Sequence, residues 1–568
     1  MKPLKRTAIL ILALIVALLA GCAGAGNGGN TVTDVPKDPD ATEDPYKDYT
    51  VWTSSREAGK AAQDTSKTIE DYTLMEGTAE KFKVANYFAN NMIIARDRRI
   101  EIWGTADEDQ NGKVVTAEFK GLKGSGVIEN GEFCFALQGT LPASKEKGNS
   151  LIVRGAEGVE KEYTDVLVGD IWIVSGQSNA DLTFSGTVAK STTDIKKLYN
   201  EYLNNATADD DIRIMQQINW NILNRDGSKR MASPQSDVGK STKWQLAERK
   251  KVAASGTSAF SMLGYFFAKE LYTLNPEVPI GIVMGACGGA PLSILAPASA
   301  LEKFPESLKY KSLTLNGINI PPAGIYNIFM APLTHVGVTG MIFYQGESDA
   351  NESKDYCDAL KYTVEAYREQ FGTDMLFLNV QLTSYGYESG GTNLDGVWNY
   401  VPDMRFAEAE VKIDDSIHNY EIIPSIDVGW KDGDADGAHP YYKFELGQRG
   451  AQMAAALLYG IGNMEDVGFP VPAKVMYKND EIVILYDYAG GGLKTVDGGE
   501  VQGFEVKLNG AWQPAQVTID GNKITIAADN AQGVRYAPSL RYFSTETANL
   551  CSGTDNIAVP FEIVFSDK

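Results

Sequence analysis

Residues 166–179, VLVGDIWIVSGQSN, decide how the chain should fold. This run of Val, Leu, Ile and Trp shows little alternation, which is typical of a strand buried on both faces in a parallel sheet. It ends in the small polar cluster Gly176-Gln177-Ser178-Asn179. Open α/β sheets carry their ligands at the carboxyl ends of strands, so Ser178 is a candidate nucleophile. Ser and Asn are also common turn residues, and the cluster alone leaves an ordinary strand-to-loop turn equally open.

The segment 167–465 alternates strands and helices, which is the pattern of a doubly wound parallel α/β sheet. Apolar periodicity predicts, in chain order, a helix at 260–274, strands at 278–284 and 340–344, a helix at 356–371 and a strand at 375–381. Strands that end near Ser178, Gly285 and Gln345 finish in small or polar residues. We therefore expect a site assembled from several loops at one edge of the sheet.

Short alternating runs dominate both flanks of this segment. Over 83–166 and again over 466–568 they predict N-terminal and C-terminal β-sandwich-like domains. Within the first flank, Asp107-x-Asp109-x-Asn111-Gly112 with Glu118 has the spacing of a calcium loop. Its surroundings are typical of strands rather than helices, so a β-hairpin turn is favoured and calcium binding stays open.

The N-terminus has the layout of an export signal. Residues 1–21 hold basic residues, then an apolar run, and end in Leu19-Ala20-Gly21 directly before Cys22. This ending resembles a bacterial lipobox, which predicts cleavage before Cys22 and lipidation of that cysteine, with a plain signal peptide as the alternative. Residues 22–82 are then a flexible tether and lead-in. We expect a protein that is exported and lipid-anchored to the bacterial cell envelope, on its surface or periplasmic side.

The charge balance narrows the choice of partners. The chain has 74 acidic and 52 basic residues, a formal net charge of -22, and no extended basic run interrupts it after the signal. Nucleic acid and anionic lipid headgroups are therefore poor partners. Membrane contact is expected only through the N-terminal lipid anchor, and the oligomeric state is left open.

Four cysteines remain besides Cys22, and they lie far apart in the sequence: Cys134, Cys287, Cys357 and Cys551. None belongs to a Cys-x-x-Cys pair, so no zinc site is expected and any disulfide pairing is undetermined. Cys134 stands between Phe133 and Phe135 in a strand-like run, which favours a buried thiol.

Histidine is scarce, and the chain holds only His335, His418 and His439. His439 stands in Asp436-Gly437-Ala438-His439-Pro440, where a carboxylate three residues earlier can hold the Nδ1 proton and leave Nε2 to accept a proton from a serine. A solvated surface turn is the alternative. The overlapping pattern Asp432-x-Asp434-x-Asp436-Gly437 imitates a calcium loop, but its twelfth position is Lys443, and a cation there argues against the metal.

Four motifs occur in an order that resembles the sialate O-acetylesterases of the SGNH hydrolase superfamily. They are Gly169-Asp170-Ile171-Trp172 running into Ser175–Asn179, Tyr326-Asn327 before Ala331-Pro332-Leu333, Tyr344-Gln345-Gly346-Glu347-Ser348, and Asp436-x-x-His439-Pro440. The resemblance extends over nearly all of the chain from about Tyr87 onward. It implies an SGNH-type, flavodoxin-like version of the doubly wound sheet.

The resemblance also implies roles for the site residues. Ser178 would be the nucleophile, His439 the base and Asp436 its orienting partner. The oxyanion donors would be the Ser178 amide, a glycine amide at Gly288 or Gly289, and the Gln345 side chain, while Asn179 and Glu347 would support the site. No metal or cofactor is expected, because serine esterase chemistry needs neither. Ala180, Cys287 and Asp349 depart from the family pattern and leave the acyl pocket and the sugar specificity open.

Two classes of function follow from these patterns. The first is a carbohydrate O-acetylesterase whose substrate is an O-acetylated sugar, either a sialic acid or, alternatively, acetylxylan or another polysaccharide. The second is a non-catalytic, glycan-binding surface lipoprotein that retains the scaffold. The presence of Ser178, Asp436 and His439 together favours the enzyme, because a binding module has no need of all three. The sugar and the acetylated hydroxyl position are not predicted.

Overall fold

The computed structural model of the chain describes residues 46–54, 72–185, 196–201, 211–216, 230–248, 252, 260–372, 374–384, 400–429, 435–436, 439–539 and 546–565. The signal segment and Cys22 lie outside these residues. Asp48–Lys568 forms one compact unit, distinct from Met1–Lys47. Its buried apolar side chains make one continuous core that runs from Ala79 to Phe565. The domain boundaries expected from the sequence stay predictions.

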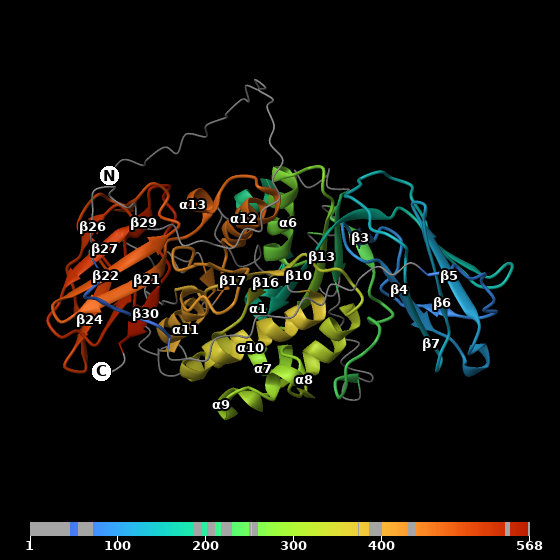
Figure 1. Cartoon of the computed structure of the whole chain (residues 1–568), viewed down its shortest axis with the longest axis horizontal. Helices are drawn as coiled ribbons and strands as arrows, with labels where there is room; N and C mark the ends of the chain where they lie inside the picture. The colour runs from blue at the N-terminus through green and yellow to red at the C-terminus, as the bar shows by residue number, and fades with distance from the viewer. Residues whose placement is uncertain are drawn as a thin grey trace, which may run out of the picture. The chain divides into compact units, whose positions relative to one another are not determined.

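A largely parallel sheet forms the centre of this unit (Figure 1). Its strands are, in spatial order, β12 (Trp244–Leu246), β11 (Ile212–Gln216), β13 (Ile280–Ala286), β10 (Leu167–Gly176), β16 (Gly340–Tyr344), β17 (Leu376–Val380) and β18 (Tyr420–Ile423). Only β12 runs antiparallel to its neighbour, and the short strand β3 (Ile93–Ala95) pairs in parallel with the beginning of β10. The parallel α/β sheet predicted from the sequence is confirmed.

Strand β10 is the central strand, and all ten of its residues are buried. It pairs in parallel with β13 on one side and with β16 on the other, so that Gly176 lies level with Ala286 and Tyr344. Gly176 has a φ of 127°, and a Cβ at this position would lie 2.1 Å from the Tyr344 carbonyl oxygen. Only glycine fits there, so the strand ends where the sequence predicts and Ser178 follows at its carboxyl end.

Helices cover both faces of the sheet, as Figure 1 shows. Helices α6 (Met262–Leu274) and α12 (Lys443–Ala454) pack together on one face, and α10 (Ser353–Phe371) and α11 (Val401–Ile413) pack together on the other. Helix α6 begins where Ser261 accepts a hydrogen bond from the Gly264 amide, and α10 ends at Gly372, whose φ is 117°. Shorter helices are α7 (Leu292–Leu295), α8 (Ala298–Leu301), α9 (Glu306–Lys309) and α13 (Met464–Val467).

Antiparallel sheets precede the α/β segment. One contains β2 (Lys83–Val84), β4 (Glu101–Thr105) and β7 (Glu132–Ala136), and the other β6 (Leu122–Val127), β5 (Val114–Phe119), β8 (Leu151–Arg154) and β9 (Glu160–Tyr163). Strands flank the acidic loop at 107–112, as expected, but the hairpin prediction is wrong. Because β4 pairs with β7 whereas β5 pairs with β6 and β8, this loop crosses from one sheet to the other.

Further antiparallel sheets follow the α/β segment. One contains β1 (Thr50–Val51), β21 (Val471–Lys478), β22 (Glu481–Asp487), β27 (Lys523–Ala527) and β26 (Thr518–Asp520). A second contains β25 (Ala511–Pro514), β24 (Phe504–Leu508), β28 (Gly533–Tyr536) and β30 (Phe561–Val564), and β23 (Leu493–Thr495) pairs with β29 (Leu550–Ser552). Two small ribbons, β14 (Leu313–Leu315) with β15 (Ile318–Ile320) and β19 (Ala435–Asp436) with β20 (His439–Pro440), complete the described strands.

The prediction of a buried Cys134 is wrong, and strand geometry explains the error. Phe133 and Phe135 on β7 are buried, whereas Cys134 between them is exposed. Successive side chains of a strand point to opposite faces, so two core-facing phenylalanines direct the residue between them away from that core. Cys134, Cys287, Cys357 and Cys551 are all free thiols in this structure.

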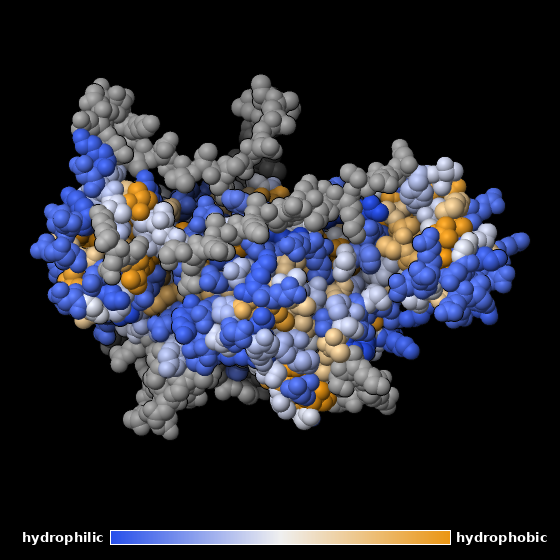
Figure 2. All heavy atoms as spheres, turned by 60° about the horizontal axis from the view of Figure 1, so that its bottom comes forward, coloured by the Kyte–Doolittle hydropathy of each residue, from blue (hydrophilic) through white to orange (hydrophobic). Residues whose placement is uncertain are grey.

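The surface is largely polar. On the face seen in Figure 2, hydrophilic residues predominate and apolar residues occur in separate small patches. Among the described residues, none of the helices combines the length and the apolar character that a membrane crossing requires.

Candidate active site

Ser178 and His439 lie within hydrogen-bonding distance although 261 residues separate them in the chain. Ser178 opens the short helix α1 (Ser178–Asp181) directly after β10, and its side chain is half-buried. The His439 Nε2 lies 2.8 Å from the Ser178 Oγ. An imidazole nitrogen at this distance can accept the hydroxyl proton, which is the contact that a serine nucleophile requires.

The ribbon of β19 and β20 brings His439 to this position. The two strands pair antiparallel, with Asp436 directly opposite His439 in the ladder. Gly437 and Ala438, between these two strands, lie outside the described residues. The role expected for the Asp436 carboxylate stays a prediction.

A glycine turn after β13 lies beside the nucleophile. The turn is held in place by two hydrogen bonds, from the Cys287 amide to the Gly176 carbonyl oxygen and from the Ser348 hydroxyl to the Gly289 carbonyl oxygen. A Cβ on Gly288 would lie 3.9 Å from the Ser178 Cβ, and Gly289 has a φ of 77°. Both glycines are half-exposed. Backbone amides so close to a serine are suited to stabilise an oxyanion, although this role too stays a prediction.

Gln345 lies next to the site but has a different set of partners from the one expected. It is fully buried, and its Nε2 donates to Asp349 Oδ2 at 2.8 Å and to the Ala290 carbonyl oxygen at 3.1 Å. Its Oε1 accepts from the Tyr356 hydroxyl at 2.6 Å. The Gln345 amide therefore joins the loops after β13 and β16, and this conformation does not support the oxyanion role expected for it.

Asp349, one of the departures from the family pattern, has a structural explanation. Besides Gln345, it accepts a hydrogen bond from the Leu292 amide at 2.7 Å and forms an ion pair of 3.0 Å with Lys311. The buried carboxylate is thus fully partnered, as buried charges must be. It fixes the position of Gln345 and of the start of α7.

A buried polar relay lies beneath the nucleophile. The Lys443 Nζ donates to Asn179 Oδ1 at 2.6 Å, and the Asn179 Nδ2 donates to Glu347 Oε1 at 2.5 Å. All three side chains are buried, and Lys443 also lies over the Tyr344 ring, 5.0 Å from its centroid. Asn179 is the neighbour of Ser178, so the relay fixes the start of α1. The supporting role expected for Asn179 and Glu347 stays a prediction.

The relay holds two ionisable groups whose pKa values are shifted toward each other. Burial raises the pKa of Glu347 to about 7, and burial lowers the pKa of Lys443 to about 7. Hydrogen bonding from Asn179 and the charge of Lys443 partly offset the first shift, and the charge of Glu347 partly offsets the second. Burial thus favours the neutral form of each group, and the attraction between their charges opposes that preference.

The sequence interpretation missed two acidic or basic neighbours of Ser178. Lys443 was considered only as the cation that argued against a calcium loop. Asp181 lies one turn after Ser178 in α1, and burial raises its pKa to about 7. Burial, with a further contribution from Asp181, raises the pKa of Cys287 to about 12, so this thiol stays protonated at neutral pH.

The position of these groups in the sheet is that of an α/β active site. The chain leaves β10 for β11 and β13 on one side and later crosses to β16 on the other. Ser178, Gly288 and Gln345 follow β10, β13 and β16, so they surround the point where the strand order reverses. A serine hydroxyl beside an imidazole and a glycine turn at this point is the arrangement found in hydrolases that work by acyl transfer.

The family follows from comparison with known proteins. The family of carbohydrate esterases described as sialic acid-specific acetylesterases matches residues 168–452, which is half of the chain. The chain belongs to this family and is a carboxylic-ester hydrolase of the carbohydrate acetylesterase type. The family predicted from the four sequence motifs is thus confirmed.

Individual relatives agree with this assignment. Human sialate O-acetylesterase is 24% identical over 398 residues, covering 66% of this chain and 70% of the human protein. The rat sialate O-acetylesterase is 22% identical over 361 residues, covering 57% of this chain and 63% of its own length. The crystal structure of a carbohydrate acetylesterase from Xanthomonas citri has a similar fold, with a TM-score of 0.67, 23% identity, and coverage of 85% of this chain and 99% of that one.

Proposed function

We propose that this enzyme removes O-acetyl groups from sugars through an acyl-enzyme intermediate, with Ser178 as the nucleophile, His439 as the base and Asp436 as the group that orients the imidazole. The 2.8 Å contact between the Ser178 Oγ and the His439 Nε2 is the observation that carries this proposal. Family membership supplies the ester chemistry, and this contact supplies a means of activating the hydroxyl.

The reaction proceeds in two acyl transfers. His439 accepts the Ser178 proton as Oγ attacks the acetyl carbonyl carbon, and it then gives that proton to the departing sugar oxygen. Water next gives a proton to His439 and attacks the acetyl-serine, and the proton returns to Ser178 as acetate leaves. Each tetrahedral oxyanion would accept hydrogen bonds from the amides of Ser178 and of Gly288 or Gly289. Each such donor contributes about 3 kcal/mol to the transition state.

The substrate proposed is an O-acetylated sialic acid, with acetylxylan or another acetylated polysaccharide as the alternative. The support is the family description and the curated relatives named as sialate O-acetylesterases.

We further propose that the flanking antiparallel sheets form sandwich-like domains, and that the enzyme is exported and held at the cell envelope by a lipid on Cys22. A Cys22→Ala protein that still fractionated wholly with membranes would contradict the lipid anchor.

Acetate release tests the proposed function directly. The wild-type chain and the Ser178→Ala variant are compared on O-acetylated sialosides, acetylated xylan and an aryl acetate. We expect the wild-type chain to release acetate from the sialosides and the Ser178→Ala variant to release none. If the wild-type chain cleaved the aryl acetate but neither sugar, it would be an esterase whose substrates are not the ones proposed. Acetate release by Ser178→Ala would show that Ser178 is not the nucleophile.

A further inference from the structure

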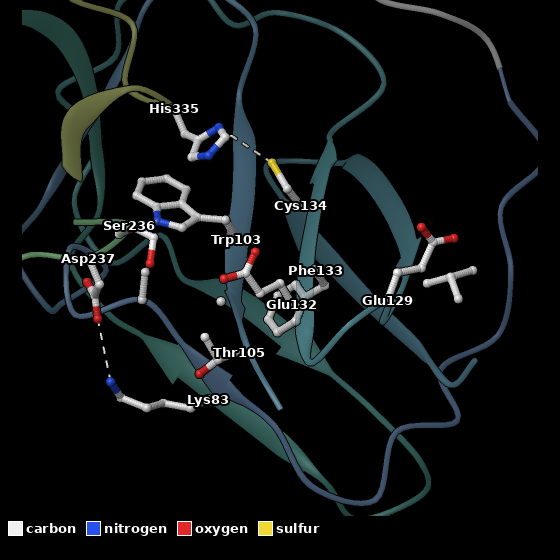
Figure 3. Close-up of a pocket in the computed structure, with 13 residues that line it drawn as sticks. Lys83, Trp103, Thr105, Glu129, Glu132, Phe133, Cys134, Ser236, Asp237 and His335 are labelled. Atoms are coloured by element: carbon white, nitrogen blue, oxygen red, sulfur yellow. Dashed lines mark hydrogen bonds and ion pairs between the residues drawn. The ribbon is translucent and has the colours of Figure 1, made fainter. Parts of the chain in front are cut away.

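A second cluster of chemically reactive side chains contains His335, which lies outside the esterase site. The His335 Nδ1 lies 2.7 Å from Glu101 Oε2 and 3.5 Å from the Cys134 Sγ. Glu101 begins β4, Cys134 lies on β7, and His335 follows the 3-10 turn Ala331–Leu333. In Figure 3, His335 and Cys134 point toward one another, with Trp103 beside the imidazole.

This cluster and Ser178 lie at opposite edges of the central sheet, the cluster where the parallel strands begin and Ser178 where they end. Strands β10 and β16 are parallel, with Trp172 level with Gly340. Ser178 follows the carboxyl end of β10, whereas His335 precedes the amino end of β16. The two histidines therefore belong to separate sites.

We propose that Glu101, Cys134 and His335 bind a divalent transition-metal ion, with Zn²⁺ as the ion that this ligand set favours. The carboxylate oxygen, thiol sulfur and imidazole nitrogen all lie within 4.8 Å of one another. Thiolate, imidazole and carboxylate are the three ligand types that zinc takes in proteins, and three protein ligands with an open fourth position are typical of accessible zinc sites. Neither calcium nor magnesium favours a sulfur ligand.

Two of the three ligand separations can be compared with those around a tetrahedral ion. Zinc bonds of about 2.3 Å to sulfur and about 2.0 Å to nitrogen place those two atoms about 3.5 Å apart in a tetrahedral site. The observed separation of Sγ and Nδ1 is 3.5 Å. The carboxylate must move farther from Nδ1, from 2.7 Å to about 3.4 Å, as the ion takes the place of their shared proton.

The surroundings favour access by a cation. Cys134 and His335 line a pocket of about 340 Å³ whose wall also holds Glu129, Glu132 and Asp237, with Lys83 paired to Asp237 at 3.5 Å. Arg99 forms an ion pair of 3.0 Å with Glu101 Oε1, which leaves Oε2 directed at His335. The fourth coordination position would open into this pocket and hold water.

Cobalt provides a direct probe of this site, because a Co²⁺–thiolate bond gives a charge-transfer band in the near ultraviolet. We expect the full chain to bind one equivalent of Co²⁺ with this band, and Zn²⁺ to abolish the band by displacing Co²⁺. Cys134→Ser should remove the band, and His335→Ala and Glu101→Gln should each weaken binding by at least about tenfold. His418→Ala, at an exposed histidine outside the cluster, is the matched control and should bind as the wild type does.

Thermal unfolding provides a second measurement, which also shows whether a variant that fails to bind metal is folded. Without metal, Cys134→Ser should unfold in a transition similar to that of the wild type. Zn²⁺ should then raise the melting temperature of the wild type and of His418→Ala but not of Cys134→Ser, because a ligand stabilises only the state that binds it. A missing Co²⁺ band in the folded wild type, or a band that survives in Cys134→Ser, would overturn the proposal. These readouts do not depend on acetate release, so they stand or fall separately from the proposed function.

Discussion

The two edges of the central sheet each present a histidine, but the groups around the two rings differ. At the carboxyl edge, the His439 Nε2 contacts a serine hydroxyl beside a glycine turn. At the amino edge, the His335 Nδ1 contacts a carboxylate and a thiol beside an acidic pocket. The comparison teaches that the partners of an imidazole set its chemistry: a hydroxyl partner favours proton transfer, and a thiol with a carboxylate favours a metal ion.

The two edges also differ in how deeply their polar and charged side chains are buried. Beneath Ser178, the relay of Lys443, Asn179 and Glu347 is wholly buried. At the amino edge, Glu101 is buried but Cys134 is exposed. The carboxyl edge thus has a rigid polar foundation, whereas the amino edge is open to ions from solution.

The largest expected effect tests the carboxyl edge itself. Ser178→Ala and His439→Ala should each lower kcat on the order of a thousandfold, because each removes a group that acts directly on the reacting atoms. The double variant should be about as slow as either single one, since the two groups act as a unit. Steady-state acetate release measures all three, with His418→Ala as the control. If the His439→Ala enzyme, with His335 and His418 intact, were active, another group would be the base. The contrast between the two histidines would then not hold.

Removal of the relay's cation should cost both stability and rate. Lys443→Met leaves Asn179 Oδ1 without its donor and removes the positive charge that offsets the buried Glu347 carboxylate. We expect the free energy of unfolding to fall by about 3 kcal/mol, with a lower kcat as Asn179 no longer fixes the start of α1. Urea unfolding and acetate release provide the two measurements. Lys474→Met, at an exposed lysine on β21, is the matched control and should change the free energy of unfolding little. Equal stability of the two variants would show that the relay is not a foundation for the site.

Part of the pH dependence of stability should come from Glu347. Its folded-state pKa is raised to about 7 by burial, from an ordinary value of 4.5, so the folded chain holds a proton that the unfolded chain releases between these pH values. The free energy of unfolding should therefore fall as pH rises from about 4.5 to about 7, by on the order of 2 kcal/mol. Glu347→Gln should remove this part of the pH dependence, and Glu132→Gln, at an exposed carboxylate on β7, should retain it. Identical profiles for Glu347→Gln and the wild type would place the titration on another group.

The smallest expected effect distinguishes two roles of Gln345. Its observed partners predict that Gln345→Ala lowers the free energy of unfolding by about 1 kcal/mol, because Asp349 and Tyr356 each lose a hydrogen bond. An oxyanion donor would instead lower kcat by about a hundredfold or more with little change in stability. Urea unfolding and acetate release on the same variant separate the two outcomes. A selective loss of kcat would restore the role expected from the family motif.

Local patterns were enough to predict the elements that position Ser178. The apolar run of β10, the strand 340–344 and the helix that ends at Phe371 follow from periodicity and from the residues that end them. His439 could be selected because histidine is scarce and an aspartate precedes it across a glycine turn. These features depend on neighbours in the sequence, which a single chain displays directly.

Contacts between distant segments could not be predicted in this way. Lys443 reaches Asn179 across 264 residues, and His335 reaches Glu101 across 234, so no spacing rule connects them. Gln345 occupied its expected place in the loop, but only the packing around it shows that Asp349 and Ala290 bind its amide. The exposure of Cys134 was the one error that the sequence could have prevented, because two buried phenylalanines already define the opposite face of β7.

The position of β1 determines where a mechanical load would enter the enzyme. β1 has two residues, lies at the edge of the C-terminal sheet beside β21, and is followed by Trp52, which donates from its amide to Val475 and from its Nε1 to Val564. A pull on the chain ahead of Thr50 would thus act first on this short strand. Because so short an edge strand has few hydrogen bonds, it should detach before the β21–β22 ladder opens. Because β21 pairs with β22 independently of β1, the loss of β1 would leave that ladder in place.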